Sequence, residues 1–188
     1  MNLYLIRHTS LSVPEGICYG QSDVDISTSF YAELAQLKAK LQYLSVDAVY
    51  ASPLQRCRKL AYALDIAAVK LDERLQELHF GDWEMLAWDA IPRDKFDIWA
   101  QDFANLSPPN GESFSTLYHR VTEFIEEVSS HLKGKNIVIV THGGVIRAVL
   151  ANVLNMPLKN LFQIVVDFGS VTQVSFLDTV PKVHYVNR

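Results

Sequence analysis

The chain has 188 residues, of which 49% are hydrophobic and 20% are charged, a balance that is typical of a soluble globular protein. Its 17 basic and 21 acidic residues give a formal charge of −4 without a lysine-rich run, which argues against a nucleic-acid partner. No stretch of about 18 apolar residues and no signal-peptide pattern occurs, so we expect a cytoplasmic protein without a membrane span. No long linker divides the sequence, and we expect one domain over residues 1–188.

Two buried strands are each predicted to end at a histidine. Residues 3–6 form an apolar run that stops at Arg7 and His8, and residues 136–141 form another that stops at His142. In an open α/β sheet, ligands bind at the carboxyl ends of the strands, so both histidines are expected at one edge. A lone histidine at a strand end is more often structural than catalytic, but this shared context favours a functional pair.

Helices and strands alternate between these two strands. A long loop over residues 9–20 leads to an amphipathic helix that begins at Phe30. A short strand over residues 48–51 then precedes a helix from Leu54 to about Leu64. This order is typical of an α/β protein.

Three charged side chains are further candidates for the same edge. Arg56 and Arg58 lie in the first turns of the predicted helix, where an anion also meets free backbone N–H groups. We expect Arg56 to face the strand ends and Arg58 to lie in solvent. Glu77 has apolar neighbours in the sequence, and a partly buried carboxyl group is suited to proton donation. By composition alone, this residue is equally well interpreted as a surface acid.

The second half of the chain contributes more packing elements. After a brief strand over residues 69–71, we expect a short helix from Glu84 toward Ile91. Five aromatic residues then either cap the core or wall a pocket: Trp83, Trp88, Phe96, Trp99 and Phe103. The remaining predicted elements are helices over residues 114–132 and 145–154, and strands over 162–166, 171–177 and 183–186 joined by turns at 167–170 and 178–181. The closely spaced last strands favour antiparallel hairpins and hence a mixed sheet.

The candidate residues have the chemistry of a phosphate site. Two guanidinium groups, two imidazoles and a helix N-terminus at Gly143 suit a dianion, for which phosphate is the common biological example. No glycine-rich P-loop or paired aspartates indicate a nucleotide or metal site, and we expect no metal and no cofactor. Cys18 and Cys57 lack a metal-binding spacing and are interpreted as buried or incidental thiols. A neutral histidine is then the candidate nucleophile.

Five blocks of the sequence resemble, in order, the motifs of the histidine phosphatase superfamily. They are Arg7-His8, Ser52-Pro53-Leu54-Gln55-Arg56, LQELHFGDWE over residues 75–84, Asn110-Gly111-Glu112-Ser113, and Thr141-His142-Gly143-Gly144. The resemblance implies a three-layer α/β/α fold with a mixed, mostly parallel central sheet, as in phosphoglycerate mutases. It also implies that a phosphohistidine forms during the reaction.

The resemblance assigns roles to particular residues. His8 matches the nucleophile, Glu77 the general acid and base, and Arg7, Arg56 and His142 the groups that hold the phosphoryl oxygens. The expected substrate-binding residues are Arg7, Thr9, Tyr19, Gly20, Arg56, Glu77, His142 and Gly143. Thr9 replaces the family glycine and offers a hydroxyl group. We expect His8 to be neutral and His142 cationic, with diverging pKa values.

Within the superfamily, residues 18–25 and 79–84 look most like the α-ribazole phosphatase branch. That resemblance implies hydrolysis of α-ribazole 5′-phosphate, a small phosphorylated metabolite of cobalamin assembly, by a monomer or a homodimer. A broad-specificity or sugar-phosphate phosphatase with the same site is the nearest alternative. A phosphoglycerate mutase and a non-catalytic phosphate-binding module are weaker hypotheses.

Overall fold

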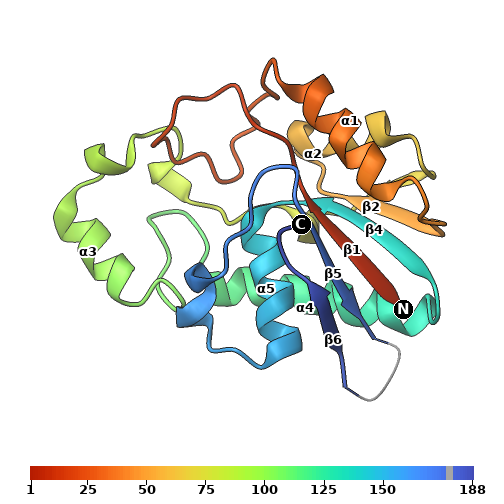
Figure 1. Cartoon of the computed structure of the whole chain (residues 1–188). Coiled ribbons are helices and arrows are strands. Elements are labelled where there is room, and N and C mark those ends of the chain that lie inside the picture. The colour runs from red at the N-terminus through yellow and green to blue at the C-terminus, as the bar shows by residue number, and fades with distance from the viewer. Residues whose placement is uncertain (177–179) are drawn as a thin grey trace.

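A six-stranded mixed sheet forms the centre of the computed structural model, which describes residues 1–176 and 180–188 (Figure 1). The strand order is β3-β2-β4-β1-β5-β6. The strands are β1 (Asn2–Arg7), β2 (Ala48–Ala51), β3 (Val69–Leu71), β4 (Asn136–Thr141), β5 (Val171–Ser175) and β6 (Lys182–Tyr185). The first four pair in parallel, and β5 is antiparallel to both β1 and β6. The predicted mixed, mostly parallel sheet is therefore confirmed.

Helices cover both faces of the sheet and make it the middle of three layers (Figure 1). On one face, α1 (Phe30–Leu41) and α2 (Gln55–Leu64) enclose one hydrophobic core. On the other, α4 (Phe114–His131) and α5 (Gly143–Leu154) enclose a second and larger one. Because both faces are covered, the middle residues of β1 and β4 are all apolar, which explains why these strands read as continuous hydrophobic runs.

The register of β1 and β4 brings the two histidines together. The strands are parallel, and Arg7 lies opposite Thr141. His8 and His142 each follow directly, so both leave the sheet at the same edge, on the side of the molecule that carries α3 (Arg93–Gln101; Figure 1). This confirms the predicted arrangement of the two strand ends.

The helix predicted from Glu84 toward Ile91 is wrong. The chain instead forms 3₁₀ turns, η2 (Gly81–Trp83) and η3 (Trp88–Ala90), which follow η1 (Glu73–Leu75). Two features stop a regular helix: Met85 has a positive φ of 65°, and backbone groups of Met85 and Leu86 form hydrogen bonds with the backbone of Cys18 in another loop. Backbone groups that are paired in this way are not available for hydrogen bonds within a helix.

The strand predicted over residues 162–166 is also wrong. Its first residues belong to the 3₁₀ helix η4 (Leu158–Gln163), and the chain beyond is irregular. The carbonyl groups of Ile164 and Val166 accept hydrogen bonds from the side chains of Arg147 and Arg7 rather than from a neighbouring strand. Arginine side chains have therefore replaced a sheet partner. The strand predicted to end at Leu177 and the turn predicted over 178–181 extend into residues 177–179, outside the described residues; the antiparallel pairing of β5 with β6 is confirmed.

Candidate active site

The imidazole rings of His8 and His142 are buried together, with 5.2 Å between their centroids. His8 Nδ1 lies 2.8 Å from the carbonyl oxygen of Thr9. A carbonyl oxygen only accepts hydrogen bonds, so the hydrogen is on Nδ1 and the lone pair is on Nε2. The backbone of the next residue thus orients His8 as a neutral base or nucleophile.

Burial and nearby cations act on both histidines in the same direction. Desolvation and the charges of Arg56 and Arg7 hold the pKa of His8 well below its usual value. For His142, desolvation again lowers the pKa most, followed by the charges of Arg56, His8, Arg120 and Arg7. The expectation that His142 is cationic is wrong for this arrangement, because burial and the same arginines lower the pKa of both rings.

His142 contacts the side chains of Arg56, Ser52 and Cys57, and its hydrogen bond with Arg56 fixes its tautomer. Arg56 Nε donates to His142 Nδ1 over 3.3 Å, and His142 Nε2 lies 2.8 Å from Ser52 Oγ. Because Nδ1 is the acceptor, Nε2 carries the hydrogen and donates it to Ser52. Ser52 was part of a sequence motif, but only the structure reveals this contact.

Arg56 is fully buried, although it carries a charge. Its Nη1 donates to the Ser22 carbonyl over 2.8 Å and its Nη2 to the Gly20 carbonyl over 2.6 Å. Two backbone carbonyls and a histidine therefore fix the guanidinium in one orientation. Arg58 is exposed, so the prediction that Arg56 is the inward-facing arginine is confirmed.

Arg7 is held by the irregular segment that precedes β5. Its guanidinium carbon lies 3.8 Å from the centre of the Phe168 ring, and Nη1 donates to the Val166 carbonyl over 2.5 Å. Its Nε is buried without a hydrogen-bond partner. In the described part of the chain, neither Arg7 nor Arg56 pairs with a carboxylate, so an anion would find two uncompensated cations here.

Glu77 meets the first turn of α5. Its Oε2 accepts a hydrogen bond from the backbone N–H of Gly144 over 3.1 Å, and its Oε1 one from Leu78 over 2.9 Å. A Cβ atom at Gly144 would lie 2.1 Å from Oε1, and one at Gly143 would lie 3.0 Å from Arg147 Nη1. The two glycines thus let a carboxylate and a guanidinium approach the positive end of the helix closely.

An aromatic pocket of about 170 Å³ adjoins Glu77. It is lined by Ile17, Cys18, Tyr19, Gly20, Glu77, Phe80 and Trp88. Trp83 and Trp99 are instead buried in a small core with Cys18 and Ile91. The aromatic cluster therefore does both things that the sequence left open: its interior caps the core and its edge walls a pocket.

The remaining candidates occupy the margins of the site. Thr9 is fully buried, and its hydroxyl group has no hydrogen-bond partner. The centre of the Tyr19 ring lies 5.4 Å from the Arg56 guanidinium carbon, and burial raises the pKa of the Tyr19 hydroxyl group. Cys18 and Cys57 are free buried thiols, as interpreted from the sequence, and burial raises the pKa of Cys18 to about 12.

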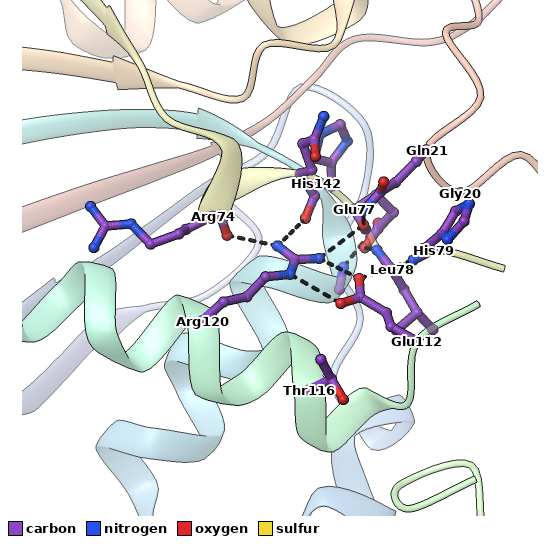
Figure 2. A network of polar contacts seen from close by, with 12 residues as sticks. Gly20, Gln21, Arg74, Glu77, Leu78, His79, Glu112, Thr116, Arg120 and His142 are labelled. Atoms are coloured by element: carbon purple, nitrogen blue, oxygen red, sulfur yellow. Dashed lines mark hydrogen bonds and ion pairs between the residues drawn. The ribbon is translucent and has the colours of Figure 1, made fainter. Parts of the chain in front are cut away.

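Two residues that sequence reasoning did not assign to the site hold its loops in place. The Glu84 carboxylate accepts hydrogen bonds from the backbone N–H groups of Gln21, Ser22 and Phe80. Arg120 binds the segment that carries Glu77 (Figure 2). Glu84 lies inside a recognised motif, whereas the only signal for Arg120 was its place on the predicted helix.

The profile of the histidine phosphatase superfamily (branch 1) matches residues 3–188. The chain belongs to the histidine phosphatase superfamily. Its sequence and fold are those of a phosphatase enzyme. In the described residues, no group of three or more histidine, cysteine or carboxylate side chains is arranged to hold a metal, and no helix is long and apolar enough to cross a membrane.

Individual relatives carry two kinds of name. A Hydrogenobacter thermophilus protein with the provisional name phosphoserine phosphatase 2 is 31% identical over 99% of this chain and 95% of its own length. An adenosylcobalamin/alpha-ribazole phosphatase of Escherichia coli is 30% identical over 90% of this chain and 87% of its own length. The crystal structure of the alpha-ribazole phosphatase from Shigella flexneri superposes with a TM-score of 0.91 at 28% identity, covering 100% of this chain and 96% of that one.

Proposed function

We propose that this histidine phosphatase hydrolyses a phosphomonoester through a phosphohistidine on His8, and that its substrate is α-ribazole 5′-phosphate. The reaction class rests on the family and on the geometry around His8. The substrate rests on the pocket beside Glu77 and on the relatives named α-ribazole phosphatase.

In the first step, the lone pair of His8 Nε2 attacks phosphorus and the bond to the leaving oxygen breaks. The guanidinium groups of Arg7 and Arg56 meet the negative charge on the three other oxygens. The N–H group of Gly143 completes this cradle, and His142 holds Arg56 in place through its Nδ1 acceptor. Because these groups are already fixed by backbone carbonyls and by Ser52, little reorganisation is needed as the charge develops.

Glu77 completes both halves of the reaction. In its acid form it gives a proton to the leaving oxygen, which departs as an alcohol. The resulting carboxylate then takes a proton from water, and the oxygen of that water attacks the phosphohistidine to release phosphate and neutral His8. Glu77 lies at the boundary between the cationic cradle and the aromatic pocket, where a leaving group would meet it.

The lining of the aromatic pocket is the observation that supports the choice of α-ribazole 5′-phosphate as the substrate. Glu77 is the only aspartate, glutamate, lysine or arginine among its lining residues, and three others are aromatic. At about 170 Å³ the pocket is smaller than a typical drug-sized site, so it suits one flat ring system. The benzimidazole of α-ribazole is such a ring, whereas the carboxylate of phosphoserine would find no cation in this lining.

The test is a comparison of kcat/KM for α-ribazole 5′-phosphate, phosphoserine, 3-phosphoglycerate and a panel of sugar phosphates, with EDTA present. We expect a preference of at least about a hundredfold for α-ribazole 5′-phosphate, which corresponds to about 2.7 kcal/mol in the transition state. Trp88→Ala should reduce that preference while leaving small phosphoesters unaffected. A flat profile would refute the substrate, and turnover by His8→Ala would refute the nucleophile.

A further inference from the structure

The segment that carries Glu77 has no secondary structure to hold its backbone. Residues 76–80 lie between the 3₁₀ turns η1 and η2 and in no strand. Buried carbonyl groups in such a segment need hydrogen-bond donors from elsewhere. The Leu75 carbonyl receives one from Thr141 Oγ1 over 2.8 Å, and the Glu77 carbonyl receives one from Gln21 Nε2 over 3.0 Å.

Arg120, on α4, supplies most of the remaining donors (Figure 2). Its Nη1 donates to the carbonyls of Arg74 and Gln76, both over 2.7 Å, and its Nη2 donates to that of Glu77 over 3.0 Å. One guanidinium therefore binds three carbonyl groups within four consecutive residues. It determines the path of the backbone just where the Glu77 side chain leaves it.

Glu112 holds the guanidinium of Arg120 from the other side. Its Oε1 accepts from Arg120 Nη2 over 2.5 Å and its Oε2 from Nε over 3.2 Å, so all five N–H donors of Arg120 are used. Oε1 also accepts the backbone N–H of His79 over 3.0 Å. The pair is mostly buried, with 18% of the Arg120 side chain and 15% of the Glu112 side chain exposed. Arg120 and Glu112 together thus hold both flanks of Glu77 (Figure 2).

We propose that Arg120, held by Glu112, is a positioning residue that aims the Glu77 carboxyl group at the leaving oxygen. This inference rests on the proposed role of Glu77 as the general acid. Lysine cannot replace arginine here, because an ammonium group has three donors and no planar fork. General-acid catalysis depends on hydrogen-bond reach, so a small shift of this backbone should reduce proton donation without disturbing the phosphate cradle.

The experiment compares Arg120→Lys with the matched control Arg74→Lys. Arg74 lies on the same segment, but its side chain pairs with Asp72 and Glu127 away from the site. Each variant is assayed with an alkyl phosphate, whose leaving group needs protonation, and with p-nitrophenyl phosphate, whose leaving group does not. For Arg120→Lys we expect kcat to fall at least about tenfold on the alkyl phosphate and less than about threefold on the aryl phosphate. KM and the Kd of inorganic phosphate should stay within about threefold, and Arg74→Lys should match the wild type.

A double-mutant cycle separates positioning from a general loss of fold. If Arg120 acts through Glu77, then Glu77→Gln/Arg120→Lys should be no slower on the alkyl phosphate than Glu77→Gln alone. Additive losses, or equal losses on the two substrates, would overturn the proposal. Should Arg120→Lys fail to fold, Glu112→Gln, which loosens the same guanidinium, must give the same leaving-group pattern. If Glu77→Gln loses equal activity on the two substrates, the proposed role of Glu77 as the general acid fails. If Glu77→Gln loses more activity on the alkyl phosphate but Arg120→Lys does not, only the positioning role of Arg120 fails.

Discussion

Gly144 leaves the space that the Glu77 carboxylate occupies. A Cβ atom at this position would lie 2.1 Å from Glu77 Oε1, and its three nearest neighbours would all be atoms of the Glu77 side chain. Because that oxygen is the end of a flexible side chain, Gly144→Ala should move the carboxylate rather than unfold the helix. In addition, alanine is favoured over glycine inside a helix by about 0.5–1 kcal/mol. We predict an unchanged or higher Tm together with a loss of at least about tenfold in kcat on alkyl phosphates.

Gly111→Ala is the control for this prediction. Its added Cβ would meet the backbone carbonyl of His79 at 2.5 Å and the backbone nitrogen of Gly81 at 3.0 Å. Backbone atoms cannot move aside cheaply, so this variant should lower Tm instead. Thermal unfolding and steady-state kinetics on the two variants give opposite patterns if the reasoning is right. A Gly144→Ala enzyme with full activity would show that the position of the Glu77 carboxylate is not critical.

The two buried histidines should make stability depend on pH below neutrality. Burial and the neighbouring arginines lower the pKa of both rings in the folded state, so the folded protein binds fewer protons than the unfolded chain once pH falls below about 6.5. Acid therefore favours unfolding, by at most about 1.4 kcal/mol per pH unit for each histidine. No such loss occurs above that range, where both states are neutral.

Denaturant unfolding between pH 7.5 and 5 measures this dependence. We expect the free energy of unfolding to fall with acidification in the wild type and to fall less steeply in His142→Gln. His119→Gln should behave like the wild type because His119 is exposed on α4. The window stays above the usual range of carboxylates, and the comparison with His142→Gln separates this histidine from the Met1 amino group, whose pKa burial also lowers. Equal slopes in the wild type and in His142→Gln would contradict the assignment.

At the scale of elements, a loop rather than a helix or strand determines the orientation of Arg56. The carbonyls of Gly20 and Ser22 bind the guanidinium, and the Glu84 carboxylate holds this loop through the N–H groups of Gln21 and Ser22. Glu84→Gln keeps one acceptor oxygen but turns an amide N–H₂ toward backbone donors. We predict that Arg56 loosens and that the Kd for inorganic phosphate rises about tenfold, or about 1.4 kcal/mol.

Calorimetric titration with inorganic phosphate checks the Glu84 prediction. Glu127→Gln is the matched control, because Glu127 pairs with Arg74 on the surface and touches no part of the loop. It should bind phosphate as the wild type does. A Glu84→Gln protein with unchanged affinity would mean that the orientation of Arg56 does not depend on this loop.

Elements with a regular period were predictable from the sequence, and those held by side chains were not. The strand over residues 48–51 and the helices α4 and α5 follow from runs of buried residues. The wrong elements, a helix after Glu84 and a strand over 162–166, lie where the backbone forms hydrogen bonds with a distant loop or with arginine side chains. Those contacts join residues far apart in the sequence, so no local pattern reveals them.

The same distinction holds for the site as a whole. His8 and His142 were predictable neighbours because parallel strands end together, and Arg56 because a helix begins beside them. The supporting contacts of Ser52 and Arg120 were not predictable, since each depends on the packing of one element against another. Sequence motifs thus locate the reacting groups, while the groups that orient them require the fold.

Phosphate should stabilise the whole molecule, because its cradle is assembled from three separate parts of the chain. Arg7 and His8 lie at the end of β1, Arg56 lies in the first turn of α2, and Gly143 begins α5. A ligand that binds only the folded state stabilises it by RT ln(1 + [L]/Kd), so inorganic phosphate at a hundred times its Kd should add about 2.7 kcal/mol. Thermal unfolding in phosphate, against sodium chloride of equal ionic strength, measures this effect. Arg56→Ala should lose most of it, since the variant removes the buried cation that is least replaceable by solvent. A phosphate-dependent rise in Tm that survives in Arg56→Ala would place the anion elsewhere on the molecule.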